Sequence, residues 1–130
     1  MRVIIAGSRD LGCDIMAVVR AVEASGFEIT EVVCGEAPGI DTAGRKWAHA
    51  HKIPVASFPA KWDDLNAPGA VIKKRVDGTR YNLKAGYDRN IQMAHNADAL
   101  IAIQKNASRG TQHMIDTARK LNLKIYVETL

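Results

Sequence analysis

The sequence predicts an α/β protein with a five-stranded parallel β-sheet that is covered by helices on both faces. Short, mostly apolar runs alternate with amphipathic segments along the chain. Within each run, apolar residues follow one another instead of alternating with polar ones, which is typical of strands buried on both faces. Glycine and proline gather where a strand gives way to a helix, as expected for the connecting loops.

Five runs have the length and composition of buried strands. They span residues 3–6, 29–34, 53–58, 99–103 and 123–127. The third run contains a proline near its start, which a strand tolerates at that position.

Four helices are expected between these strands. The first follows Asp14, a suitable cap, and stops at Gly26, and the second begins with Asp41 as its cap. The other two are expected at residues 87–96 and from about 109 to 121. Right-handed crossovers then give a Rossmann-like doubly wound sheet, most simply in the order 3-2-1-4-5.

The segment from 66 to 85 does not fit this alternation and is expected to be an inserted basic arm. Asp77-Gly78 between short β-prone flanks predicts a hairpin with a two-residue turn. The arm is a solvated surface hairpin, a lid over an anionic ligand, or an arm that reaches a neighbouring subunit. Its cations are Lys73, Lys74, Arg75, Arg80 and Lys84.

Length and composition favour one globular domain that spans residues 1–130. The chain has 130 residues, 47% of them hydrophobic, a net charge of +4 and two cysteines. This charge permits an anionic partner but does not require a polynucleotide. The first ten residues turn polar too soon for a signal peptide, and no apolar run reaches membrane-spanning length. We therefore expect a cytoplasmic protein with reduced thiols and no membrane partner.

Three loops are expected to meet where ligands bind in such folds, at the carboxyl ends of the strands. Each combines glycine, hydroxyl or arginine side chains with the start of a helix, which suits a phosphate group. They are Gly7-Ser8-Arg9, the loop from Gly35 through Glu36 and Gly39 to Asp41, and Ser108-Arg109-Gly110-Thr111. Neither a G-x-G-x-x-G motif nor a P-loop occurs, which disfavours dehydrogenases and kinases. We expect no metal and no resident cofactor.

Several short motifs together resemble the YspA-like branch of the SLOG superfamily. They are Gly7-Ser8-Arg9, G-x-A-x-G-x-D at 35–41, Trp47-Ala48, Phe58-Pro59-Ala60-x-Trp62, Ala85-Gly86-x-x-Arg89-Asn90, and Ser108-x-Gly110-Thr111. The resemblance runs from Met1 to about Tyr126 and is interrupted only by the basic arm. It implies a Rossmann-like core with a phosphate or nucleotide site at these loops. The resemblance also implies association into a homodimer or larger homo-oligomer. Many short members of the branch look phage-borne, so a phage origin is also expected.

The LOG enzymes of the superfamily hydrolyse the N-glycosidic bond of nucleoside monophosphates with an arginine and a glutamate. Arg89 matches that arginine, whereas Met114 stands at the glutamate position. Methionine can neither stabilise a ribosyl cation nor activate water. The carboxylate of Glu36, Asp41 or Asp116 would have to replace it.

The resemblance and the loops lead to one main hypothesis and two alternatives. We expect a pocket that binds a nucleotide or nucleotide-derived phosphorylated molecule. Trp62 or Tyr87 would lie near the base, and the remaining ligand-binding candidates are Gly7, Ser8, Arg9, Gly35, Glu36, Gly39, Asp41, Arg89, Asn90, Ser108, Arg109, Gly110 and Thr111. The first alternative is an N-glycosidase of nucleoside 5′-monophosphates with Arg89, Glu36 and Asp41 as catalytic residues. The less favoured one is single-stranded nucleic-acid binding through the basic arm.

Overall fold

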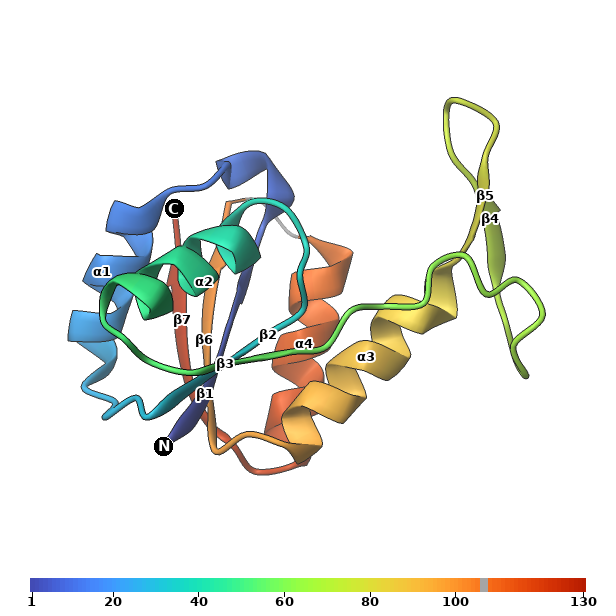
Figure 1. The fold of residues 1–130 in the computed structure, drawn as a ribbon. Helices are drawn as coiled ribbons and strands as arrows, with labels where there is room; N and C mark the ends of the chain where they lie inside the picture. Colours follow the sequence, from blue (N-terminus) through green and yellow to red (C-terminus); the bar gives the residue numbers. More distant parts are fainter. Residues whose placement is uncertain (106–107) are drawn as a thin grey trace.

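A computed structural model describes residues 1–105 and 108–130 and shows a five-stranded parallel sheet between two helical layers (Figure 1). The strand order is β3-β2-β1-β6-β7, which is the predicted order 3-2-1-4-5 with the hairpin strands left out of the count. The strands are β1 (Arg2–Gly7), β2 (Glu31–Cys34), β3 (Val55–Ser57), β6 (Ala99–Gln104) and β7 (Lys124–Thr129). The fold class predicted from the apolar runs is confirmed.

The two helical layers bury opposite faces of the same strands. The helices are α1 (Ile15–Ser25), α2 (Ile40–Ala50), α3 (Leu83–His95) and α4 (Arg109–Lys120), with a short 3-10 helix at Arg9–Leu11. Val3 and Ile5 pack on the side of α1 and α2, while Ile4 and Ala6 pack on the side of α3 and α4. Because both faces are covered, successive strand residues are apolar and no alternation is visible in the sequence.

Side-chain caps explain where α1 and α3 begin. The Asp14 carboxylate accepts a hydrogen bond from the Ala17 N–H at 3.0 Å, and Gly26 ends α1 in the left-handed conformation, as predicted. The third helix starts four residues before the predicted position. Asn82 caps it by accepting from the Lys84 N–H at 3.1 Å. The inserted arm is correspondingly shorter at its carboxyl end.

The inserted arm contains an antiparallel hairpin of β4 (Ile72–Lys74) and β5 (Arg80–Asn82), which projects from the body beyond α3 (Figure 1). The predicted two-residue turn is wrong. The Arg75 N–H donates to the Thr79 carbonyl at 2.8 Å and closes a three-residue loop, in which Gly78 has a φ of 91°. Three-residue hairpin loops commonly place glycine in this conformation, so the glycine was identified correctly and the loop length was not.

Candidate functional site

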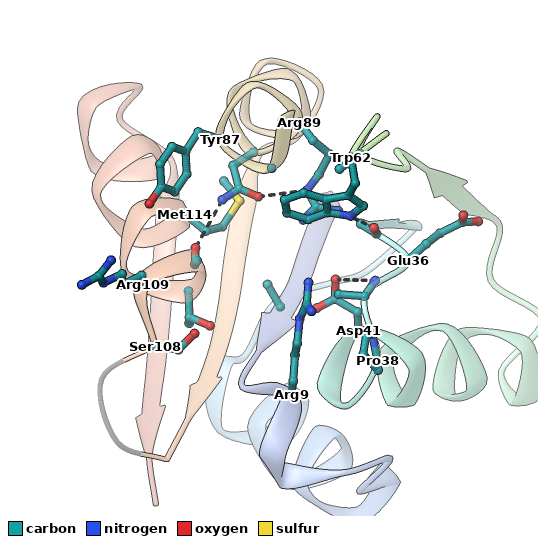
Figure 2. A pocket seen from close by; sticks show the side chains of 18 of the residues that line it. Arg9, Glu36, Pro38, Asp41, Trp62, Tyr87, Arg89, Ser108, Arg109 and Met114 are labelled. Carbon is teal, nitrogen blue, oxygen red and sulfur yellow. Dashed lines mark hydrogen bonds between the residues drawn. The ribbon is translucent and has the colours of Figure 1, made fainter. Parts of the chain in front are cut away.

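A pocket of about 900 Å³ opens at the carboxyl ends of the parallel strands. Its lining includes residues from the loops after β1, β2 and β6, from α3 and α4, and from the hairpin. Figure 2 shows Ser108 and Arg109 on the α4 side and Arg9 and Asp41 on the other. The three loops singled out in the sequence therefore meet at one site, as the strand order requires.

Arg89 crosses the pocket from α3 to the loop after β2. Its Nη1 donates to the Gly35 carbonyl, and its Nε donates to the Asn90 Oδ1 at 3.1 Å. A Cβ on Gly35 would collide with the guanidinium, so a larger residue there would displace the end of the Arg89 side chain. Burial lowers the pKa of Arg89, and the nearby Asp41 carboxyl opposes that shift. Since an arginine stays protonated in proteins, Arg89 is a half-buried positive charge whose remaining donors are available to a ligand.

Asp41 is the buried carboxylate of the pocket, with only 5% of its surface exposed. It lies in the first turn of α2, where its Oδ2 accepts from the Ala37 N–H at 3.3 Å. The expected capping role is wrong, because Gly39 occupies the N-cap position. Burial raises the pKa of Asp41 to about 6, although Arg89, the Ala37 and Gly7 backbone N–H groups and Arg9 all act to lower it.

Glu36 lies on the rim of the same pocket and is exposed. Its side chain points away from Arg9 and Arg89 (Figure 2). Its φ of 58° is left-handed, a conformation that glycine adopts at lower cost. Asp41, rather than Glu36, is therefore the carboxylate closest to the arginines of the pocket.

Trp62 forms the aromatic part of the pocket wall. The guanidinium carbons of Arg9 and Arg89 lie 5.8 and 6.0 Å from its ring centroid, and Tyr81 packs edge-on against it at 6.0 Å. The α3 residue beneath the indole is Gly86, where a Cβ would overlap the ring. Glycine at this position lets the indole lie directly on the helix.

Alanine at Gly86 is expected to displace Trp62 and to disturb its contacts with both arginines. The added methyl would lower the free energy of unfolding by about 1–3 kcal/mol, the usual penalty for overpacking, partly offset by the better helix propensity of alanine. Tryptophan fluorescence and urea unfolding would measure the two effects. An unchanged emission spectrum of the folded variant would show that Trp62 does not depend on this glycine; Gly110→Ala is the control, because a Cβ there meets no neighbouring atom within 4 Å.

Asn90 links α3 to the start of α4. Its Nδ2 lies 3.2 Å from the Gly110 carbonyl and 3.1 Å from Nδ1 of His113, whose ring stacks on Tyr87 at 4.3 Å. Burial lowers the pKa of His113, which favours the neutral ring that can accept from Asn90. Its Oδ1 accepts from Arg89, so the Asn90 amide links the Arg89 side chain to the first turn of α4 through hydrogen bonds.

Of the predicted ligand-binding residues, all but two line the pocket. The lining members are Gly7, Arg9, Gly35, Glu36, Asp41, Trp62, Arg89, Asn90, Ser108, Arg109, Gly110 and Thr111. Ser8 is fully buried, and its hydroxyl accepts from the Lys105 N–H at 3.2 Å, which ties the ends of β1 and β6 together. Gly39 shapes the loop instead, because a Cβ there would lie 2.7 Å from the Ser8 carbonyl oxygen.

Sequence reasoning missed two cations of the lining, Lys105 and Arg75. Arg75 was recognised only as part of a basic arm, and no local signal shows that the hairpin reaches the pocket. Lys105 directly follows β6, so its place at the carboxyl edge of the sheet was the available signal. Met114 is buried in the wall, whereas Asp116 is exposed and accepts from Gln112 at 2.9 Å.

Within residues 1–105 and 108–130, no group of three or more His, Cys, Asp or Glu side chains is arranged to hold a metal ion. None of the helices in this described part of the chain is both long and apolar enough to cross a membrane.

The comparisons with known proteins agree with the motifs. No curated protein matches the sequence. A family model described as "YspA, cpYpsA-related SLOG family" matches residues 1–64, which include β1 to β3, the loops after β1 and β2, and Trp62. The five-stranded sheet and the site at its carboxyl edge agree with that match, and the chain belongs to the YspA-like SLOG family.

Proposed function

We propose that the pocket binds a nucleotide or a nucleotide-derived phosphorylated molecule. The observation that carries this proposal is the charge of the lining. The lining contains two acids, Glu36 and Asp41, and five cations, which are Arg9, Arg75, Arg89, Lys105 and Arg109. Cations gathered in a concave site attract an anionic ligand and exchange water for charge-assisted hydrogen bonds when it binds.

Two helix N-termini at the pocket add to this preference. Gly39 and Ser108 are the N-cap residues of α2 and α4, and neither makes a side-chain capping hydrogen bond, whereas α1 and α3 are capped by Asp14 and Asn82. The first N–H groups of an uncapped helix need an acceptor, and a phosphate supplies one.

The aromatic side chains suit the other end of such a ligand. Trp62, Tyr81 and Tyr87 all line the pocket. Bases stack readily on aromatic rings, and the guanidinium groups of Arg9 and Arg89 beside Trp62 would meet the phosphate. A ligand that carries both a base and a phosphate could contact the aromatic rings with the base and the arginines with the phosphate.

The test is incubation with a panel of nucleoside mono-, di- and triphosphates and dinucleotides, followed by thermal unfolding and chromatography of the same samples. A ligand that binds only the native state raises the free energy of unfolding, by about 2.7 kcal/mol at a concentration one hundred times its Kd, and so raises the melting temperature. An intact ligand together with a raised melting temperature supports binding. No shift with any compound, confirmed by calorimetry, would contradict the proposal.

The alternative is an N-glycosidase of nucleoside 5′-monophosphates, and Asp41 is the observation that favours it. A buried carboxyl with a pKa near 6 is suited to proton transfer near neutral pH. Arg89 would hold the phosphate while Asp41 activates water or stabilises the ribosyl cation. Released base that disappears in Asp41→Asn, while binding persists, would establish this activity. No release at high protein concentration would exclude it.

A further inference from the structure

The hairpin beside the pocket is strongly basic, and most of it is exposed to solvent. Every residue from 71 to 80 is exposed, and four of them are Lys73, Lys74, Arg75 and Arg80. The ion pairs found among the described residues involve none of these four. The one acid of the hairpin, Asp77, is occupied by the Thr79 N–H and hydroxyl at 3.0 and 2.7 Å. The positive charge is therefore available to a partner.

The pairing of the strands makes this charge unfavourable for the hairpin itself. Lys74 lies directly opposite Arg80 in the antiparallel register. Like charges at directly opposed positions destabilise a strand pair, and a two-stranded hairpin is marginal without further packing. Sequences break such local rules where function requires it, and a bound polyanion would remove the repulsion.

The opposite face of the hairpin continues the wall of the pocket. Lys73 is paired with Tyr81 on that face, and the Arg75 guanidinium lies 4.7 Å from the Tyr81 ring centroid. Tyr81 in turn packs on Trp62, which is flanked by Arg89. Cations and aromatic rings thus follow one another from the pocket onto the hairpin. Such interleaving is what single-stranded nucleic acids need for their phosphates and bases.

We propose that the ligand is the phosphorylated terminal nucleotide of a short single-stranded nucleic acid, and that its next phosphates lie along the hairpin. This inference rests on the proposed function, since the terminal nucleotide occupies the pocket around Arg89. The volume of about 900 Å³ is near the upper end for small-molecule sites. The chain has a net charge of +4, which disfavours a second copy as the partner of a basic surface.

Fluorescence anisotropy with DNA and RNA hexanucleotides, phosphorylated at the 5′ or the 3′ end and labelled at the other, tests this proposal. We expect one phosphorylated end to bind at least about tenfold more tightly than the matching mononucleotide in competition, and the same oligonucleotide without its phosphate to bind more weakly. If the protein neutralises three phosphates of the single strand, a plot of the logarithm of the binding constant against the logarithm of the salt concentration should have a slope of about −2.

Lys73→Glu tests the proposed role of the hairpin. Lys73 is exposed and is paired with Tyr81 on the face that continues the pocket wall, so the variant reverses a charge along the proposed path of the phosphates. Thermal unfolding checks that the variant keeps its stability. We expect oligonucleotide affinity to fall about tenfold and mononucleotide affinity to stay the same. The charge-matched control is Arg20→Glu on the exposed face of α1, which should change neither affinity.

The remaining outcomes are distinguishable. If mononucleotides bind and hexanucleotides bind no more tightly, this inference is overturned and the proposed function stands. Oligonucleotide binding that survives Arg89→Ala overturns the link between pocket and hairpin. Equal binding of poly-glutamate overturns the choice of nucleic acid as partner. If no mononucleotide or oligonucleotide binds, the inference and the proposed function both fail.

Discussion

Alanine in place of Arg89 is expected to weaken nucleotide binding about a hundredfold. A charge-assisted hydrogen bond contributes about 1.5–3 kcal/mol, and each 1.4 kcal/mol is a factor of ten in Kd. The substitution also removes the donor that holds the Gly35 carbonyl, so the loop after β2 loses its link to α3. Isothermal titration calorimetry with the best ligand of the panel would measure the loss.

Two further variants make this result specific. Arg89→Lys keeps the charge without the planar fork and should lie between wild type and alanine. Arg119→Ala removes an exposed arginine near the end of α4, 3.9 Å from Asp116, and should bind like wild type. Wild-type affinity in a folded Arg89→Ala protein, as judged by circular dichroism, would rule out the central role of this arginine.

Asparagine in place of Asp41 is expected to stabilise the protein above pH 6 and to change little near pH 4. The folded state raises the pKa of this carboxyl from 3.8 to about 6, so it binds the proton more tightly than the unfolded chain does. The stability that protonation provides is fully present below about pH 4 and is lost as the pH rises through 6. Since one pKa unit corresponds to 1.36 kcal/mol, ionisation costs about 3 kcal/mol above pH 6.

Urea unfolding of wild type and Asp41→Asn between pH 4 and pH 8 would measure both the sign and the size of the difference in the free energy of unfolding. We expect the variant to gain about 3 kcal/mol at pH 8, because the pKa of about 6 already includes the favourable interactions of the charge with Arg89 and Arg9. Asp116→Asn, at an exposed position of α4, is the control for the same chemical change outside the pocket. A difference that grows toward low pH would show that Asp41 is stabilised in its ionised form.

The sheet was predictable because its information is local. Runs such as 3–6 and 99–103 are apolar without alternation, and that pattern leads to a buried parallel strand wherever it occurs. The early start of α3 was not predictable in the same way. Asn82 accepts from the Lys84 N–H and also from the Val71 N–H, and the second contact, which spans the arm, is not encoded by a local pattern.

The site shows the same division between local and distant information. Glycine-rich turns at strand ends placed the loops correctly, because parallel strands bring their carboxyl ends to one edge. The hydrogen bond between Arg89 and the Gly35 carbonyl joins residues 54 positions apart, and no local pattern encodes it. Ser8 looked like a ligand group because a hydroxyl after a strand often is one. Its burial against Lys105 is visible only in three dimensions.

The pocket is assembled from two stretches of sequence, only one of which the family model covers. The family model ends at residue 64, shortly after Trp62, so the matched stretch contributes Arg9, the loop after β2 and the indole. Arg75, Arg89 and the start of α4 all come from the unmatched stretch. The two stretches meet at the hydrogen bond from Arg89 to the Gly35 carbonyl and at the contact of Gly86 with Trp62. A change of ligand specificity would therefore require matched substitutions in both stretches.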